Sequence, residues 1–213
     1  MMSADIPLIL FAKAPIAGRV KTRLTSHCSD QQAADIACLL MQASIEKACQ
    51  AWPGKVVLSV ALDSDHTFFN DMKAQYDITL VEQCAGHLGE RMRHALDCQG
   101  YPAAVMGCDV PHISVDNLQM AYAKLLGGES VIGPAQDGGY YLLGLVESAD
   151  ELFENKPWGT AVVLQLTLDA ANKSGQKLHH LDILSDIDEW QDLVDAANQV
   201  PSLQQYLSVN DLA

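Results

Sequence analysis

Short apolar runs alternate along this chain with segments of helical periodicity, and this alternation limits the folds open to it. Ile6–Ala12 is typical of a buried strand, and Asp30–Ala51 follows with apolar residues at helical spacing. The order then repeats. The predicted strands are Ile6–Ala12, Lys55–Leu62, Ile78–Val81, Ala103–Gly107, Glu129–Gly133, Tyr140–Val146 and Leu178–Leu181. Such alternation predicts one α/β domain over residues 1–213, with a mainly parallel sheet and helices on both faces.

Six helices are predicted. They are Asp30–Ala51, His66–Gln75, Leu88–Leu96, and three helices that Ser114, Thr160 and Asp188 cap and that run to about Leu126, Asn172 and Asn198. Asp30 is the fourth predicted N-cap, since its carboxylate can accept hydrogen bonds from free N–H groups of the first turn. Ligands of such sheets bind beyond the carboxyl ends of the strands, where the strand order reverses. This rule places the expected site in the loops after the first and fourth strands.

Composition and charge exclude several function classes. The chain is 49% hydrophobic and 19% charged, which is typical of a globular protein. Its formal net charge of −14 argues against binding to nucleic acid or to an anionic membrane surface. Ile6–Ala12 is too short to span a bilayer and no basic segment precedes it, so we expect a cytoplasmic protein. The six cysteines show no C-x-x-C spacing, and free thiols are expected.

The loop after the first strand concentrates positive charge. The chain has 13 Lys and Arg residues, and four of them fall within residues 13–23. These cations are Lys13, Arg19, Lys21 and Arg23, and Pro15 and Gly18 lie among them. A phosphate-rich ligand would relieve their mutual repulsion, and the alternative is a solvated, salt-bridged surface loop. The loop matches neither the P-loop nor the dinucleotide fingerprint.

Asp109 directly follows the fourth predicted strand, and Pro111 ends that strand. A carboxylate at this position is well placed for Mg²⁺, which uses one or two carboxylates together with ligand phosphates. The alternative is an Asp that caps the turn onto the following helix. Asp186 lies in a D-x-D pair with the predicted cap Asp188 and could complete the metal site.

Two further motifs carry glycines beside polar residues. Asp137 is followed by two glycines, which suggests a ligand-facing loop with an acceptor-site role, although an ordinary hairpin turn would explain Asp137 and Gly138 as well. Gly89 lies near a helix start with Arg91 close behind it. Exposed N–H groups and the guanidinium could bind an anion there, and a surface helix with Glu–Arg pairs is the equal alternative.

Together the motifs resemble the DUF2064 family over Leu8–Trp190. They read, in order, F-A-K-A-P-I-A-G-R-V-K-T-R-L, G-H-L-G-E-R-M, G-C-D-V-P, G-P-A-Q-D-G-G-Y-Y-L-L-G-L, P-W-G-T and D-I-D-E-W. The resemblance implies a three-layer Rossmann-like sheet of the GT-A, or nucleotide-diphospho-sugar transferase, type, with Tyr140–Val146 as its one antiparallel strand. Related folds occur in molybdenum cofactor and 2-phospholactate guanylyltransferases. Ala17 departs from the expected second proline of the first loop.

The resemblance also implies site residues. A nucleotide pocket is expected under the first loop. The residues expected to bind the nucleotide are Lys13, Pro15, Gly18, Arg19, Lys21, Arg23, Gly89 and Arg91. Asp109 would hold the metal, with Asp186 as its partner, and Asp109, Lys21 and Asp137 are the predicted catalytic residues.

We therefore predict a transferase that uses Mg²⁺ or Mn²⁺ and either a nucleoside triphosphate or a sugar nucleotide, with a small-molecule acceptor. Glycosyl transfer would release a nucleoside diphosphate, whereas nucleotidyl transfer would release pyrophosphate. Two alternatives remain open: a nucleotide-binding regulator without turnover, and an interaction protein whose basic loop docks an acidic partner. No side-chain pattern identifies the acceptor or an oligomeric state.

Overall fold

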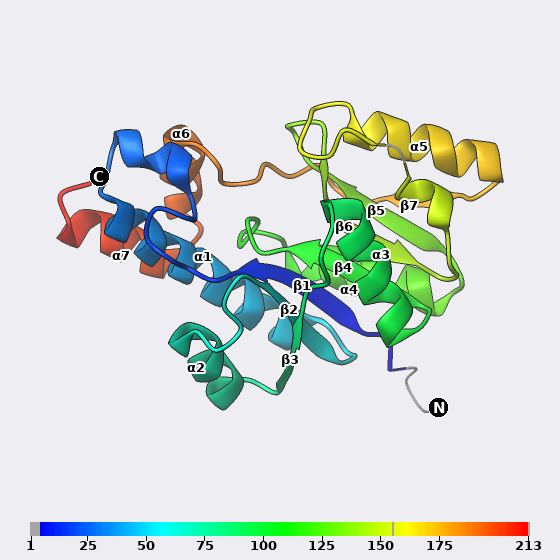
Figure 1. The fold of residues 1–213 in the computed structure, drawn as a ribbon, viewed down its shortest axis with the longest axis horizontal. Helices are drawn as coiled ribbons and strands as arrows, with labels where there is room; N and C mark the ends of the chain where they lie inside the picture. Colours follow the sequence, from blue (N-terminus) through cyan, green and yellow to red (C-terminus); the bar gives the residue numbers. More distant parts are fainter. Residues whose placement is uncertain (1–4, 155, 213) are drawn as a thin grey trace.

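A mainly parallel sheet lies at the centre of the structure (Figure 1). The computed structural model describes residues 5–154 and 156–212. This part of the chain forms a seven-stranded sheet of order β3-β2-β1-β4-β6-β5-β7. The strands are β1 (Leu8–Lys13), β2 (Val56–Ala61), β3 (Ile78–Glu82), β4 (Ala103–Gly107), β5 (Ser130–Pro134), β6 (Tyr140–Leu145) and β7 (Leu178–His180). Strand β6 runs antiparallel to β4 and β5, and the other pairs are parallel. The predicted fold class and antiparallel strand are confirmed.

Helices cover both faces of the sheet. They are α1 (Asp30–Ala51), α2 (Thr67–Gln75), α3 (Leu88–Gln99), α4 (Val115–Leu126), α5 (Val163–Ser174), α6 (Trp190–Ala197) and α7 (Pro201–Val209), with short 3-10 turns η1 (Thr22–Ser26) and η2 (Asp150–Leu152). Successive side chains of a strand point to opposite faces. Leu8 and Leu10 accordingly pack into the core beneath α1, α2 and α4, while Ile9 packs with α3 and α5.

The C-terminal helices α6 and α7 form a third core with α1, away from the sheet (Figure 1). Leu193 of α6, Leu203 of α7 and Ile36 of α1 are fully buried in this core. Helix α7 was not among the predicted helices, although Pro201 at its first turn and the spacing of Leu203 and Leu207 are helical signals. Within the described residues, none of the helices combines the length and the apolar character that crossing a membrane requires.

The strand order reverses between β1 and β4. Strands β2 and β3 extend the sheet from β1 in one direction, while β4, β6, β5 and β7 extend it in the other. Because β1 and β4 are parallel neighbours, the loops that follow them emerge at the same edge. This edge is the switch point at which ligands of such sheets bind, and it lies where the sequence placed it.

Three predicted helix caps are wrong, and one is confirmed. Ser114 caps α4 as predicted. In α1 the cap is Ser29, whose hydroxyl accepts a hydrogen bond from the Gln32 N–H, so Asp30 is already the first helical residue. The N-cap of α5 is Val162, because the Thr160 hydroxyl instead donates to the Pro157 carbonyl. Asp188 does not cap α6. The helix begins after Glu189, whose N–H donates to the Asp192 carboxylate.

Candidate functional site

The segment after β7 returns to the switch-point edge of the sheet. Leu184 donates its N–H to the Pro134 carbonyl and accepts a hydrogen bond from the Gln136 N–H. Three residues later, the Ile187 N–H donates to the Asp109 carbonyl at 3.0 Å. These backbone bonds lay residues 184–188 across the ends of β5 and β4. Asp186 and Asp188 therefore reach the edge that Asp109 occupies, even though they are distant from it in sequence.

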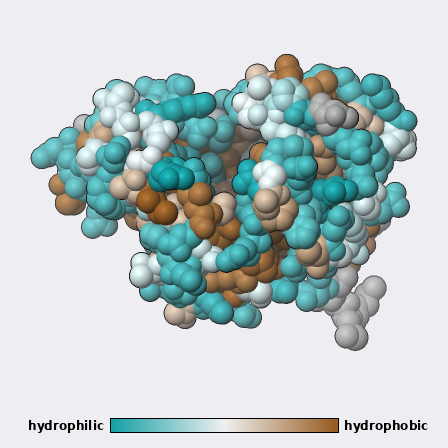
Figure 2. All heavy atoms as spheres, in the orientation of Figure 1, coloured by the Kyte–Doolittle hydropathy of each residue, from teal (hydrophilic) through white to brown (hydrophobic). Residues whose placement is uncertain are grey.

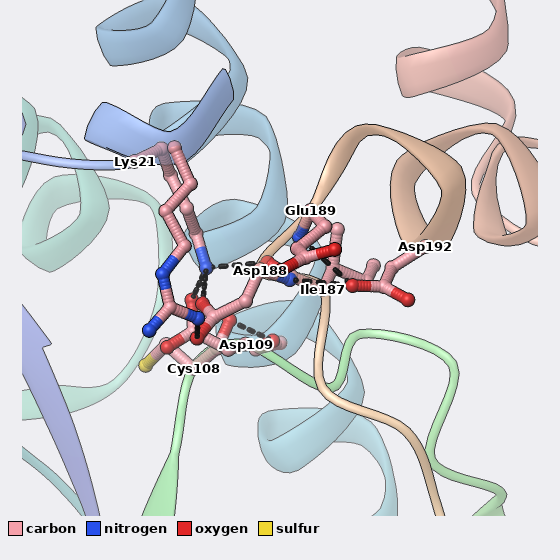
Figure 3. Close-up of polar contacts among 9 residues, drawn as sticks. Lys21, Cys108, Asp109, Ile187, Asp188, Glu189 and Asp192 are labelled. Atoms are coloured by element: carbon pink, nitrogen blue, oxygen red, sulfur yellow. Dashed lines mark hydrogen bonds and ion pairs between the residues drawn. The ribbon is translucent and has the colours of Figure 1, made fainter. Parts of the chain in front are cut away.

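Lys21 lies at the centre of a polar network at this edge and contacts Asp109 and Asp188 (Figure 3). Its ammonium lies 2.5 Å from Asp109 Oδ1 and 3.1 Å from Asp188 Oδ1, and it donates to the Ile187 carbonyl at 2.6 Å. The Lys21 side chain is only 9% exposed. Burial alone would lower the pKa of Lys21, but the two carboxylates outweigh it and hold that pKa above its ordinary value. Lys21 is therefore a charged internal cross-link between the loops after β1 and β4 and the segment after β7.

The backbone of Lys21 adopts an unusual conformation that aims this side chain. Its φ of 44° and ψ of 39° lie in the left-handed region, where residues other than glycine are uncommon. Such strain persists when the surroundings fix the residue, and the three acceptors of the ammonium do so here. Lys21 was expected to bind phosphate directly. In the structure its ammonium instead contacts three oxygen atoms of the protein.

A cleft of about 580 Å³ opens beside this network. It is called the cationic cleft below, because Lys13, Arg19, Arg23 and Arg91 line it together with Lys21 and Asp109. The structure thus brings together all five of the cations predicted to bind phosphate. In Figure 2 the surface is indented between the side that carries α6 and α7 and the side that carries α5.

Gln83 positions one of these cations and was not predicted as a site residue. Its amide nitrogen donates to the carbonyls of Ser59, at 2.8 Å, and Ala12, at 3.3 Å. Its amide oxygen accepts a hydrogen bond of 3.0 Å from Arg91 Nη1. Gln83 thus ties Arg91 to the ends of β1 and β2. The Nε atom of Arg91 is buried and has no hydrogen-bond partner among the described residues.

Three predicted nucleotide-binding residues lie outside the lining of this cleft. Pro15 is buried and borders a separate hollow next to α2. Gly18 adopts a φ of +73° and lies next to the side chain of Asp30, at the start of α1. Gly89 lies beneath the indole ring of Trp158, where an added Cβ would approach a ring carbon to 2.2 Å. Gly89 therefore makes room for Trp158 at the start of α3, which is a packing role.

A second, smaller pocket of about 180 Å³ adjoins the cationic cleft. The two share Asp109 and Leu88 in their linings. This second pocket is called the acidic pocket, because Asp109, Asp137 and Asp186 line it. Asp137 also shapes the turn before β6, since its Oδ1 accepts the Gly139 N–H at 2.7 Å. The Asp137 side chain therefore both stabilises the turn and lines the pocket.

The carboxylates of the acidic pocket influence one another. Burial raises the pKa of Asp186, and the negative charges of Asp137, Asp188 and Asp109 raise it further. Among the described residues, no group of three or more His, Cys, Asp or Glu side chains is arranged to hold a metal ion by itself. Asp109 and Asp186 nevertheless border one pocket and repel each other, a donor set that fits Mg²⁺ or Mn²⁺ when ligand phosphates supply further oxygens.

Solved structures share this fold. The protein from Desulfovibrio desulfuricans G20 described as a "putative nucleotide-diphospho-sugar transferase" is 28% identical, with a TM-score of 0.80 over 96% of this chain and 95% of that one. The 4-diphosphocytidyl-2C-methyl-D-erythritol synthase from Anaerococcus prevotii DSM 20548 is 12% identical, with a TM-score of 0.60 over 94% and 98% of the two chains. Rv0371c from Mycobacterium tuberculosis H37Rv, solved in complex with manganese, is 16% identical, with a TM-score of 0.51 over 92% and 100%.

The last two likenesses concern the fold alone. No curated protein matches the sequence. A family model described as "Uncharacterized protein conserved in bacteria (DUF2064)" matches residues 44–160, more than half of the chain and a stretch that includes Arg91, Asp109 and Asp137. The chain belongs to the DUF2064 family.

Proposed function

We propose that this protein is a metal-assisted transferase that takes a nucleotide donor in the cationic cleft and an acceptor in the acidic pocket. The observation that carries the proposal is the junction of the two cavities at Asp109, on the switch-point edge of the sheet. Five cations and the carboxylates of Asp109 and Asp188 line one cavity, whereas three carboxylates and no described cation line the other, so the two suit different ligands. The likeness to the protein from Desulfovibrio desulfuricans described as a "putative nucleotide-diphospho-sugar transferase" supports this class of reaction.

Different residues of the two cavities have different roles in this proposal. Lys13, Arg19, Arg23 and Arg91 neutralise the donor phosphates and stabilise the charge that develops on the leaving group. Asp109 and Asp186 would hold the divalent cation, which supplies Lewis-acid stabilisation of the phosphate oxygens. Lys21 keeps Asp109 and Asp188 in place from the side of the cleft. Asp137 lies across the acidic pocket, where it can accept a proton or a hydrogen bond from the acceptor.

Glycosyl transfer is the first candidate reaction, as the name of the 28% identical protein suggests. The acceptor oxygen or nitrogen attacks the sugar carbon, the bond between that carbon and the phosphate oxygen breaks, and a nucleoside diphosphate leaves. Its test is incubation of the protein with sugar nucleotides, Mg²⁺ or Mn²⁺ and acceptors, followed by phosphorus NMR. Release of nucleoside diphosphate that requires Asp109 supports this reaction.

Nucleotidyl transfer is the second candidate, and the cation-rich cleft favours it, because a triphosphate carries more charge than a sugar nucleotide. Here the acceptor attacks the α-phosphorus, and pyrophosphate leaves. The same NMR assay with nucleoside triphosphates separates the two reactions by their products. If neither product forms with any donor while nucleotides still bind, the protein is a nucleotide-binding regulator.

Asp109→Asn separates catalysis from binding. A catalyst with this substitution should lose its turnover while its nucleotide affinity falls only partly, because the cations of the cleft remain. Asp169→Asn is the matched control, since Asp169 is an exposed residue of α5 outside both cavities.

A further inference from the structure

The acidic pocket differs in charge from the cleft it adjoins. Among the described residues, no Lys, Arg or His side chain lines it. Lys21 pairs with Asp109 from the side of the cationic cleft, which leaves Asp137 and Asp186 to set the charge of the pocket itself. An anionic group placed here would lack a cationic partner and would face two carboxylates.

A divalent cation does not reverse this charge. Lys21 already offsets Asp109, and the two positive charges of the cation would offset those of Asp137 and Asp186, so the pocket would become neutral and not cationic. The cations that would neutralise the phosphates of a bound donor line the cationic cleft and not the acidic pocket. The field in the pocket therefore opposes anionic acceptors before the metal and the donor bind, and no described side chain of the lining favours an anion afterwards.

The other walls of the pocket are aromatic and aliphatic. Tyr140, Tyr141 and Trp158 line it beside Met92 and Val163. Trp158 is fixed in this position, because its ring rests on Gly89 and stacks near His87, with ring centroids 6.1 Å apart. Its indole Nε1 is buried and has no hydrogen-bond partner among the described residues. Flat apolar walls with a few convergent carboxylates suit a ligand that has an apolar face and several hydrogen-bond donors.

We propose that the acidic pocket selects a non-anionic acceptor, namely a polyhydroxy or amino compound whose hydroxyl or ammonium groups donate to Asp137 and Asp186 while its apolar face packs on Trp158. This inference rests on the proposed function, since it assigns the acceptor of that reaction. It excludes acceptors that present a phosphate or a carboxylate to the pocket.

The test is a titration with four matched sugars, followed through the indole N–H signals in nitrogen-15 NMR. Glucose, glucosamine, glucose 6-phosphate and gluconate are the probes, and Trp158→Phe identifies the signal of Trp158. We expect glucose and glucosamine to shift this signal saturably, with affinities at least about tenfold above those of the two anions. Tighter binding of either anion, or no shift with any of the four, would overturn the proposal.

Carboxylate variants identify the source of the selectivity. In the absence of metal, Asp186→Asn should weaken glucosamine binding by about tenfold and glucose binding by less than about threefold, because only the ammonium loses an ionic partner. Asp137→Asn should act in the same direction, since Asn keeps an oxygen for the Gly139 N–H. Asp169→Asn should leave both affinities unchanged. Equal losses for both sugars in the two pocket variants would also overturn the proposal.

Nucleotide binding is measured in parallel by thermal shift, so that failure of the acceptor assignment can be distinguished from failure of the transferase proposal. If nucleotides stabilise the protein and the anionic sugars bind best, the acceptor assignment is wrong and the proposed function stands. If the non-anionic sugars bind but no nucleotide stabilises the protein, the transferase proposal fails and the pocket assignment stands.

Discussion

Removal of the Lys21 ammonium should destabilise the protein measurably, and Lys21→Met is the perturbation of choice because methionine keeps much of the buried apolar stem. The ammonium lies 2.5 Å from Asp109 Oδ1, 2.6 Å from the Ile187 carbonyl and 3.1 Å from Asp188 Oδ1. Breaking a fully buried ion pair costs about 3–5 kcal/mol, because an uncompensated charge is left inside. Here water can reach the two carboxylates, whose side chains are 51% and 43% exposed.

The expected cost therefore falls below the fully buried case. A hydrogen bond to a charged group contributes roughly 1.5–3 kcal/mol, whereas an exposed ion pair contributes about 0–1 kcal/mol. We expect Lys21→Met to lower the free energy of unfolding by about 2 kcal/mol, which corresponds to a drop in Tm of roughly 4–8 °C for a chain of this size. Urea unfolding followed by circular dichroism measures this difference, provided that the m-value is unchanged.

Lys13→Met is the matched control. Lys13 is exposed and donates only to the Arg19 carbonyl among the hydrogen bonds of the described chain, so its loss should change stability by less than about 0.5 kcal/mol. Equal costs for the two substitutions would refute the reasoning. So would strict additivity between Lys21→Met and Asp188→Asn, because two groups in direct contact should show a coupling energy.

The difference between wild type and Lys21→Met should also depend on pH in a defined way. The pKa of Lys21 is raised above its ordinary value of 10.5. A cation with a raised pKa contributes stability that is fully present below its ordinary pKa and is lost as the pH rises through the raised value. We therefore expect a constant difference between about pH 7 and pH 10, followed by a decline at higher pH.

Three further predictions concern stability elsewhere. Gly89→Ala should cost roughly 1–3 kcal/mol in urea unfolding, because its Cβ would meet the Trp158 ring, whereas Gly107→Ala has open space around its Cβ and should cost less. Ser29→Ala should cost about 0.5–2 kcal/mol by removing the cap of α1, and a smaller cost than that of Asp30→Ala would contradict the observed cap. Asp186→Asn should slightly raise the metal-free Tm at pH 7. The raised pKa of Asp186 means that its charge opposes folding as the pH rises above 3.8, so the gain should vanish in acid, where a scan of Tm against pH would reveal it.

The sheet could be predicted from the sequence because each strand is marked by the residues of its own segment. Strands such as β1 and β4 are continuous apolar runs that end at polar residues, and the alternation with helices fixes which strand ends share an edge. The same logic located Asp109 and the cationic loop at one site. Asp137 and Asp186 came from motifs, and the structure places them in one pocket with Asp109.

The partners of the side chains could not be predicted in this way. Lys21 looks like any cation of a phosphate loop, and only the path of the chain after β7 brings Asp188 to it. Asp188 likewise has the residue type of an N-cap, but its carboxylate is used by Lys21 and Arg23. Gln83 carries no sequence signal, because its hydrogen bonds go to backbone carbonyls of two other strands. Such contacts depend on tertiary structure rather than on spacing.

The Lys21–Asp188 contact spans 167 positions of the sequence. Closing so long a loop carries an entropic cost that must be met by structure formed beforehand, here the sheet and the core shared by α1, α6 and α7. During synthesis, a chain that has not yet extended through Asp188 has Lys21 and Asp109 but lacks the second carboxylate that pairs with Lys21. The contacts of Lys21 are therefore complete only after the segment that follows β7 has been synthesised and has returned to the switch-point edge.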